Sequence, residues 1–289
     1  MTSAYRVLGP GALVVLAGCC WGLYWLPVRA LEAAGWGGAL GSLIVVVTAL
    51  VILLPFVWRF RHAGERADRL GLLATATGGA SFMLYSVGLV EGSIASVILL
   101  FYLTPVWTTL ITRFVLRWPI PGLRYLVIAL GLVGLVLVLG ADGGWPLPRN
   151  SGEWLGLFAG GLWSVATIGM RLRGDPAPLV GTALFLVGAT AAGVLLWLVM
   201  PAAESAITID WPTAGWILAA AVFWWIGSML TLVWAAARLD PARVGILLMS
   251  EVLVGVFSAA LWAGEGLGPI QYIGAALLVL AGVLDAISG

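Results

Sequence analysis

Long apolar runs separated by short polar breaks make up almost the whole chain. Each run has about 20 residues, the length that an α-helix needs to cross a bilayer core about 30 Å thick. We count ten runs, at approximately residues 8–30, 36–58, 70–90, 93–115, 122–140, 153–173, 178–200, 213–234, 242–262 and 268–287. The breaks hold the arginine, proline and glycine that are typical of loops. The pattern predicts ten transmembrane helices.

The runs favour helices over a membrane β-barrel. Barrel strands are short and alternate apolar with polar residues, whereas a run such as Leu126 to Gly140 is apolar on every side. Composition agrees, because 62% of the 289 residues are hydrophobic and 9% are charged, against about half and about a quarter in soluble domains. The predicted fold class is all-α, a polytopic membrane protein with little mass outside the bilayer.

The charges predict an orientation. The chain has 14 arginines, no lysine and 13 acidic residues. Proteins that bind nucleic acid carry an excess of basic residues on one face, and this nearly neutral chain has no such excess. Because arginines gather on the cytoplasmic side, cytoplasmic termini would leave only Arg29 and Arg149 outside. The inner arginines would then be Arg6, Arg59, Arg61, Arg66, Arg69, Arg113, Arg117, Arg124, Arg171, Arg173, Arg238 and Arg243.

The sequence offers few groups for metal binding or catalysis. Cys19 and Cys20 are adjacent and provide neither a disulfide framework nor a four-ligand metal site. The single histidine, His62, lies in a basic loop, and Glu251 has no acidic companion. We therefore expect no metal, no cofactor and no enzyme activity, with an intramembrane enzyme as a remote alternative. Residues 16–19 resemble a lipoprotein processing box, but the apolar run continues beyond them, which favours an intact span.

An internal repeat divides the chain into two halves. An offset of 142 residues pairs Ala17, Gly18, Trp21 and Arg29 with Ala159, Gly160, Trp163 and Arg171. Five spans per half is an odd number, so the second half would enter the membrane from the opposite side. The predicted domains are a first five-helix repeat at 1–141, a periplasmic linker at 142–152 and an inverted repeat at 153–289. Inverted repeats favour a transporter with a midplane site and alternating access, although a duplication kept only for packing is the alternative.

Polar and aromatic residues at helical spacing supply the candidate site. The candidate substrate-binding residues are Trp21, Ser81, Tyr85, Tyr102, Thr104, Trp163, Ser164 and Glu251. The candidate hinges or kinks are Pro27, Gly78, Pro105 and Gly160. Serine, threonine and glycine also serve close helix packing in membranes, so packing is the alternative for each. The fifth and tenth spans, from Leu126 to Gly140 and from Ile273 to Leu284, are almost purely apolar and are expected to be lipid-facing supports.

Glu251 is the one carboxylate near the centre of a predicted span. A charge there costs at least about 2.5 kcal/mol on insertion scales, so we expect Glu251 to face a cavity or a partner. Two functional roles are open, coupling to protons and binding a substrate ammonium. Bracing the ninth span is the structural alternative.

Several short segments resemble the drug/metabolite transporter superfamily of EamA type. They are Trp21-Gly22, Glu91-Gly92-Ser93, Leu103-Thr104-Pro105-Val106, Leu239-Asp240-Pro241-Ala242, Ser250-Glu251 and Gly264-Glu265. Within the superfamily, the chain is most similar to exporters of aromatic and other amino acids. Three positions differ from the usual pattern, since Val252 replaces a proline, Arg117 replaces an acid and Thr104 replaces a tryptophan.

This resemblance implies an exporter of amino acids, aromatic and other neutral ones such as Met and Thr. The scarcity of charge agrees, because a nearly uncharged pathway suits a neutral or zwitterionic solute. The expected partners are that small-molecule substrate and the lipid bilayer, with no nucleic acid. We expect a monomer in a bacterial inner membrane. The alternative is a carrier of another small metabolite or drug in the same superfamily.

Overall fold

The computed structural model describes residues 9–60, 68–119, 122–141, 147–173, 177–200, 207–236, 238–239 and 241–288. Across these ranges, all regular secondary structure is helical, in thirteen α-helices and two π-helical segments. Ten helical spans in this part of the chain are long and apolar enough to cross a membrane. The predicted fold class and the predicted number of spans are therefore confirmed.

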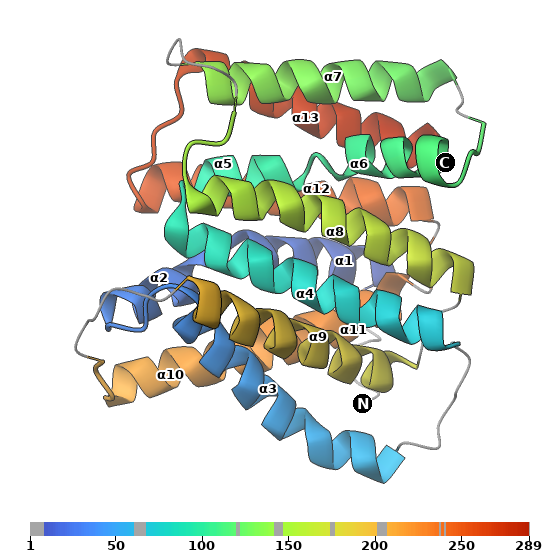
Figure 1. Ribbon diagram of the computed structural model, residues 1–289. Helices are drawn as coiled ribbons and strands as arrows, with labels where there is room; N and C mark the ends of the chain where they lie inside the picture. The colour runs from blue at the N-terminus through green and yellow to red at the C-terminus, as the bar shows by residue number, and fades with distance from the viewer. Residues whose placement is uncertain are drawn as a thin grey trace.

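Seven of the spans are single helices and three are composite. The single helices are α3 (Ala39–Phe60), α4 (Arg69–Glu91), α7 (Gly122–Gly140), α8 (Ser151–Arg173), α9 (Pro178–Val199), α12 (Pro241–Trp262) and α13 (Pro269–Ser288). The composite spans are α1 (Pro10–Gly22) with α2 (Trp25–Ala33), α5 (Ile94–Phe101) with α6 (Thr104–Leu110) and η2 (Ile111–Val115), and α10 (Trp211–Ala219) with η3 (Ala220–Ser228) and α11 (Met229–Ala236). The spans lie roughly parallel, with the end of α13 at the same end of the bundle as the start of α1 (Figure 1).

The first span is interrupted at Leu23 and Tyr24, before Pro27. Proline has no N–H for the carbonyl four residues earlier, and its ring crowds that carbonyl. The orphaned carbonyl belongs to Leu23, and the backbone N–H of Leu26 donates to it at 3.1 Å. The interruption is further held by the Tyr24 hydroxyl, which accepts from Trp225 Nε1 at 2.8 Å and from the Ser86 hydroxyl at 3.0 Å.

The fourth span is interrupted in the same way before Pro105. Helix α5 ends at Phe101, whose carbonyl Pro105 cannot satisfy. The Thr104 hydroxyl donates to the Phe101 carbonyl at 2.7 Å and replaces the missing helical bond. Two of the ten spans are therefore discontinuous near their middles, and local donors satisfy the carbonyls that the two prolines leave without a helical bond.

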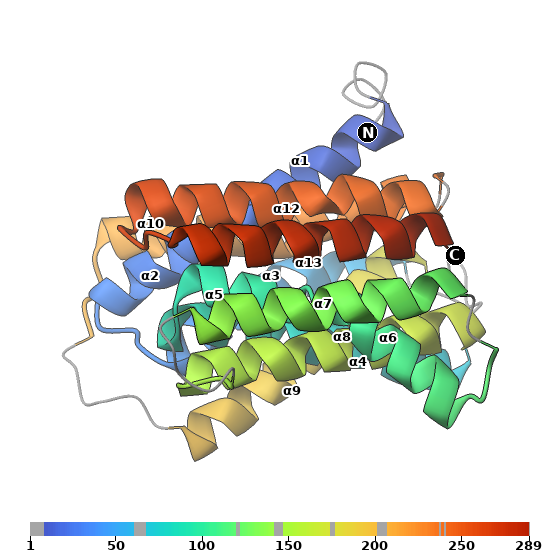
Figure 2. The same ribbon diagram turned by 90° about the horizontal axis from the view of Figure 1, so that it is seen from above.

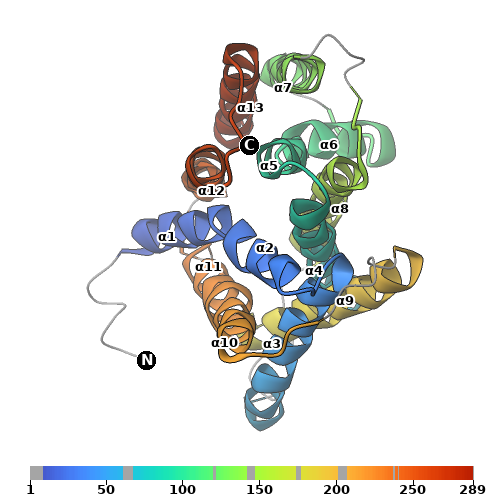
Figure 3. The same cartoon turned by 90° about the vertical axis from the view of Figure 1, so that its left-hand side faces the viewer.

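Helices of the two halves pack against each other in a crossed pattern. The first span packs against α11 and α12, which belong to the eighth and ninth spans, and α8, the sixth span, packs against α4 and α5 of the third and fourth. Helix α3 packs against α9, and α7 packs against α13. Figure 2 and Figure 3 show α7 and α13 side by side, at one edge of the bundle in the end-on view.

The contacts of the first half mirror those of the second. The first span packs against the eighth and ninth, and the sixth span, five places later, packs against the third and fourth. Such matching is expected for two related halves. The domain limits at 1–141 and 153–289 remain predictions. Of the predicted linker, residues 142–146 lie outside the described residues, and residues 147–150 lead directly into α8.

Glycines set the closest approaches between the halves. A Cβ at Gly22 would lie 2.7 Å from the Glu251 carbonyl oxygen, and a Cβ at Gly160 would overlap the Phe101 carbonyl oxygen. Small residues at such contacts let helix backbones approach closely within a membrane. Gly22 and Gly160 therefore bring α1 against α12 and α8 against α5.

Candidate functional site

A cavity of about 520 Å³ lies between the two halves. Residues from the middles of their spans line one part of it, namely Trp21, Phe82, Phe101, Tyr102, Thr104, Pro105, Thr108, Trp163 and Glu251. The other lining residues are Arg124, Arg171, Leu232, Gly245, Leu248, Met249, Gly282, Asp285 and Ala286. Several of these lie where α7 and α12 begin and where α8 and α13 end, so the cavity runs from mid-span to one end of the bundle.

We call the end that holds Arg124, Arg171 and Asp285 the open end. Arg171 lines the cavity and is exposed, so the cavity communicates with the surroundings there. The opposite end, at the turn between α4 and α5, contributes no lining residue among the described ones. We call it the closed end.

Aromatic rings form the inner wall. Phe82 lies at the centre, with ring centroids 4.7 Å from Trp21 and 5.1 Å from Trp163 in edge-on contacts. Phe101 packs 5.7 Å from Phe82 on another side. Trp21 and Trp163, the pair related by the repeat, thus flank one phenylalanine and give the cavity an apolar surface suited to a ring or an alkyl chain.

Glu251 lies at the inner wall and is held by two tyrosines. The Tyr102 hydroxyl donates to Oε2 at 2.8 Å, and the Tyr85 hydroxyl donates to Oε1 at 3.2 Å. Only 4% of Glu251 is exposed. A carboxylate has about four acceptor positions, so two donors leave room for a third partner. Glu251 therefore has both features expected from the sequence, a cavity beside it and hydrogen-bonding partners.

Five of the eight candidate binding residues line the cavity: Trp21, Tyr102, Thr104, Trp163 and Glu251. The other three do not. Ser81 donates to the Ala159 carbonyl at 2.7 Å, and Ser164 donates to the carbonyls of Gly160 and Thr104. Tyr85 stands behind Glu251 and orients it.

The four hinge candidates lie in different settings. Pro27 and Pro105 follow the two interruptions, and Pro105 also lines the cavity. Gly78 and Gly160 lie inside continuous helices. A Cβ at Gly78 would come within 3.2 Å of both Phe185 and Trp163, so this glycine makes room for the aromatic wall. Hinge motion at these positions remains a prediction.

The expectation that Leu126 to Gly140 and Ile273 to Leu284 are lipid-facing supports leaves out the charged ends of these spans, which reach the cavity. Among the described residues of the two ranges, Gly282 lines the cavity. Arg124 of α7 and Asp285 of α13 line the cavity, with Arg124 Nε 3.8 Å from Asp285 Oδ1. The sequence did not indicate that these spans line the cavity, because hydropathy is averaged over a whole span and their middles are apolar. The signal that could have found it was a pair of opposite charges on two spans that occupy equivalent places in the repeats.

Sequence reasoning also missed the aromatic residues Phe82 and Phe101. Each is a single apolar residue in an apolar span, so nothing local distinguishes it from residues that face lipid. Only the packing of α4 and α5 against α8 directs both rings to the cavity.

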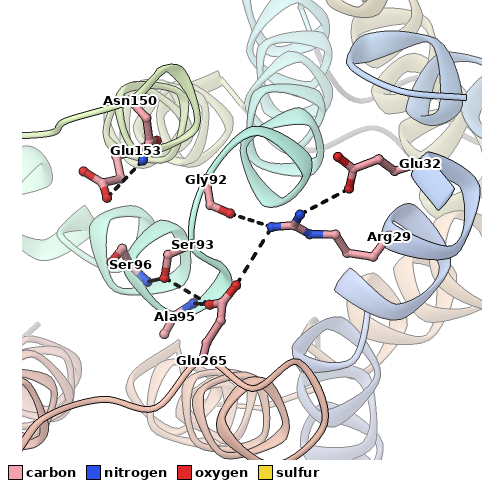
Figure 4. A network of polar contacts seen from close by, with 9 residues as sticks. All are labelled: Arg29, Glu32, Gly92, Ser93, Ala95, Ser96, Asn150, Glu153 and Glu265. Atoms are coloured by element: carbon pink, nitrogen blue, oxygen red, sulfur yellow. Dashed lines mark hydrogen bonds and ion pairs between the residues drawn. The ribbon is translucent and has the colours of Figure 1, made fainter. Parts of the chain in front are cut away.

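Arg29 connects three segments at the closed end (Figure 4). Its guanidinium donates to the Gly92 carbonyl at 2.7 Å, pairs with Glu32 at 3.2 Å and lies 3.9 Å from Glu265. Glu265 in turn accepts from the Ser93 hydroxyl at 3.0 Å and the Ala95 backbone N–H at 3.3 Å. The network joins α2, the turn between α4 and α5, and the segment before α13.

The start of α8 completes the closed end. Asn150 accepts from the Glu153 backbone N–H at 2.8 Å, while Glu153 accepts from the Arg149 backbone N–H at 2.7 Å. This reciprocal arrangement satisfies backbone donors at the helix start, as a capping box does. Gly152 lies directly against the Gly92 backbone, so the cap brings α8 onto the turn that Arg29 holds.

Comparison with known proteins finds a family likeness in the first half of the chain. No curated protein matches this sequence. A solved structure described only as "Crystal structure of protein" is similar over 96% of each chain, with 17% sequence identity and a TM-score of 0.56, and this likeness shows the fold alone. Residues 10–140 match the model of the EamA-like transporter family. Residues 10–140 contain the first five spans, so this part of the chain is similar to an EamA-like transporter domain.

Proposed function

We propose that the protein exports amino acids, aromatic and other neutral ones such as Met and Thr, across a bacterial inner membrane. The cavity between the two halves is the pathway, both termini are cytoplasmic, and access alternates between the two ends. The EamA-like domain in residues 10–140 supports the transporter class. The amino acid cargo rests on the sequence resemblance and on the chemistry of the cavity.

The observation that carries the proposal is Glu251 beside an aromatic wall. Tyr85 and Tyr102 occupy part of its hydrogen-bonding capacity and orient the carboxylate. An ammonium group offers the donors that the remaining acceptor positions require. Trp21 and Trp163 line the cavity and offer apolar surface to a side chain, and the face of a tryptophan ring attracts a nearby cation. An α-amino acid brings the ammonium and the side chain on the same carbon.

The unequal ends support alternating access. The cavity reaches the open end, while the Arg29 network joins three segments at the closed end. Crossed packing places each half against the other, so rocking one half would close one end while opening the other. Arginine distribution favours the cytoplasm for the open end, which suits a solute loaded from inside the cell.

The test is transport by purified protein in proteoliposomes. A panel of labelled amino acids, including Phe, Trp, Tyr, Met and Thr, is measured with and without a pH gradient. We expect transport of the aromatic members and slower transport of Met and Thr. Absence of amino acid transport, together with transport of a sugar nucleotide or a drug, would establish the alternative carrier.

A matched pair of variants tests the role of Glu251. We expect Glu251→Gln to lower amino acid transport at least tenfold, because an amide binds an ammonium poorly. Glu91→Gln, which changes a glutamate outside the cavity lining, keeps wild-type transport. If Glu251→Gln transports at the wild-type rate with and without the gradient, Glu251 neither binds the solute nor couples protons.

A further inference from the structure

Some charged residues of the cavity lining have a partner for their charge and one does not, among the described residues. Four of them are Arg124, Arg171, Glu251 and Asp285. Arg124 pairs with Asp285 at 3.8 Å, and Glu251 is held by two tyrosines. Arg171 makes no ion pair or hydrogen bond with any residue in the described ranges. The described part of the lining at the open end therefore carries one unmatched positive charge.

The repeat-related arginine has very different surroundings. Arg29, 142 residues earlier, has two carboxylates and a backbone carbonyl as partners. One of those carboxylates, Glu265, follows the ninth span, and the loop after the fourth span has Arg117 instead of an acid. Among the described residues, Arg171 therefore has no acidic partner like those that Arg29 uses.

We propose that Arg171, with Arg124 beside the same opening, binds the carboxylate of the transported solute at the open end. This inference rests on the proposed function and specifies the solute as an organic monoanion or zwitterion with an apolar body. A guanidinium presents several donors in one plane, a geometry that matches a carboxylate. The carboxylate of Asp285 neutralises the charge of one of the two arginines. The open end therefore suits a ligand with one negative charge better than a dianion such as a phosphate ester.

This site is separate from Glu251 and is occupied earlier. Trp163, on the inner wall, and Arg171 are eight residues apart on α8, which corresponds to about 12 Å along the helix axis. The ammonium and carboxylate of an α-amino acid are bonded to one carbon, so they do not reach both places together. The carboxylate binds first at the open end, and the ammonium meets Glu251 deeper in the cavity.

Binding of benzoate and benzamide to the full-length protein in phosphatidylcholine nanodiscs, measured by calorimetry, tests the site. The two probes share a ring and differ in charge. We expect wild type to prefer benzoate, Arg171→Gln to weaken benzoate binding about tenfold, and Arg171→Lys to restore part of the loss. Benzamide binding stays unchanged. The matched control is Arg173→Gln, on the same helix end, because Arg173 pairs with Asp68 at 3.5 Å and lies outside the lining.

Four results would overturn the proposal. They are equal affinity of wild type for the two probes, an unchanged benzoate affinity in Arg171→Gln, equal losses in Arg171→Gln and Arg173→Gln, and tighter binding of phenyl phosphate than of benzoate. Loss of benzoate binding when phosphatidylglycerol is added would assign Arg171 to lipid headgroups instead, and so would also overturn it.

The same probes separate this site from the proposed function. If benzoate binding depends on Arg171 but no amino acid is transported, the export proposal fails and the carboxylate site stands. If amino acids are transported and Arg171→Gln leaves the KM of L-phenylalanine unchanged, the carboxylate site fails and the export proposal stands.

Discussion

The predicted repeat pairs Arg29 with Arg171, yet the environments of the two arginines differ. At the closed end, Arg29 joins α2 to the turn at Gly92 and to Glu265. At the open end, Arg171 lines the cavity, and the nearby carboxylate of Asp285 pairs with Arg124. The packing of the spans is alike in the two halves, whereas the partners of the two arginines differ. The neighbours of each arginine thus decide its role.

Replacing Arg29 is expected to have the largest effect on the difference between the closed end and the open end, because it opens the closed end. Arg29→Ala removes a charge-assisted hydrogen bond, of a kind that contributes about 1.5–3 kcal/mol, and leaves Glu265 without its arginine. Opening of the closed end should rise tenfold or more. The readout is maleimide labelling of a Ser96→Cys reporter in a background with Cys19→Ser and Cys20→Ser, since Ser96 is buried behind the network. Unchanged labelling would show that other contacts close this end.

Glycine substitutions compare packing at the two ends. In Gly152→Ala, the new methyl group would overlap the Gly92 backbone, and overpacking of this kind costs about 1–3 kcal/mol. In Gly122→Ala, at the other end, the methyl group meets open space. We expect thermal unfolding in detergent to show a lower midpoint for Gly152→Ala and no decrease for Gly122→Ala. Equal midpoints would mean that the contact at Gly92 is easily relaxed.

Glu265→Gln should have a smaller effect than Arg29→Ala. The 3.9 Å ion pair is partly exposed, and such pairs contribute about 1 kcal/mol or less. Labelling of the Ser96→Cys reporter should therefore rise by no more than about fivefold. Glu91→Gln provides a control at the same end. A larger effect of Glu265→Gln than of Arg29→Ala would make the bonds to Ser93 and Ala95 the main contacts.

The pair at the open end should contribute least. Arg124 and Asp285 lie 3.8 Å apart and retain some exposure. A double-mutant cycle with Arg124→Gln and Asp285→Asn, followed by thermal unfolding, should give a coupling below about 1 kcal/mol. A coupling of several kcal/mol would show that this is a strong ion pair despite its partial exposure.

The helices were predictable because hydropathy is local. A run such as residues 122–140 specifies its own span, and the prolines at 27 and 105 place interruptions four residues before themselves. Glu251 was also identifiable, since a carboxylate in an apolar run requires a cavity or a partner. Phe82 was not, because its sequence neighbours give no sign of which face meets the other half.

The sequence alone determined ten spans with approximate limits and one glutamate near the middle of a span, and it predicted the repeat that relates Trp21 to Trp163. Tertiary structure decided that Tyr85 and Tyr102 hold Glu251, that Arg29 meets Glu265, and that the cavity opens at the end with Arg171. The physical reason is the range of the interactions. Burial in lipid acts on each segment separately, whereas hydrogen bonds and ion pairs join residues more than a hundred positions apart and depend on how the helices pack.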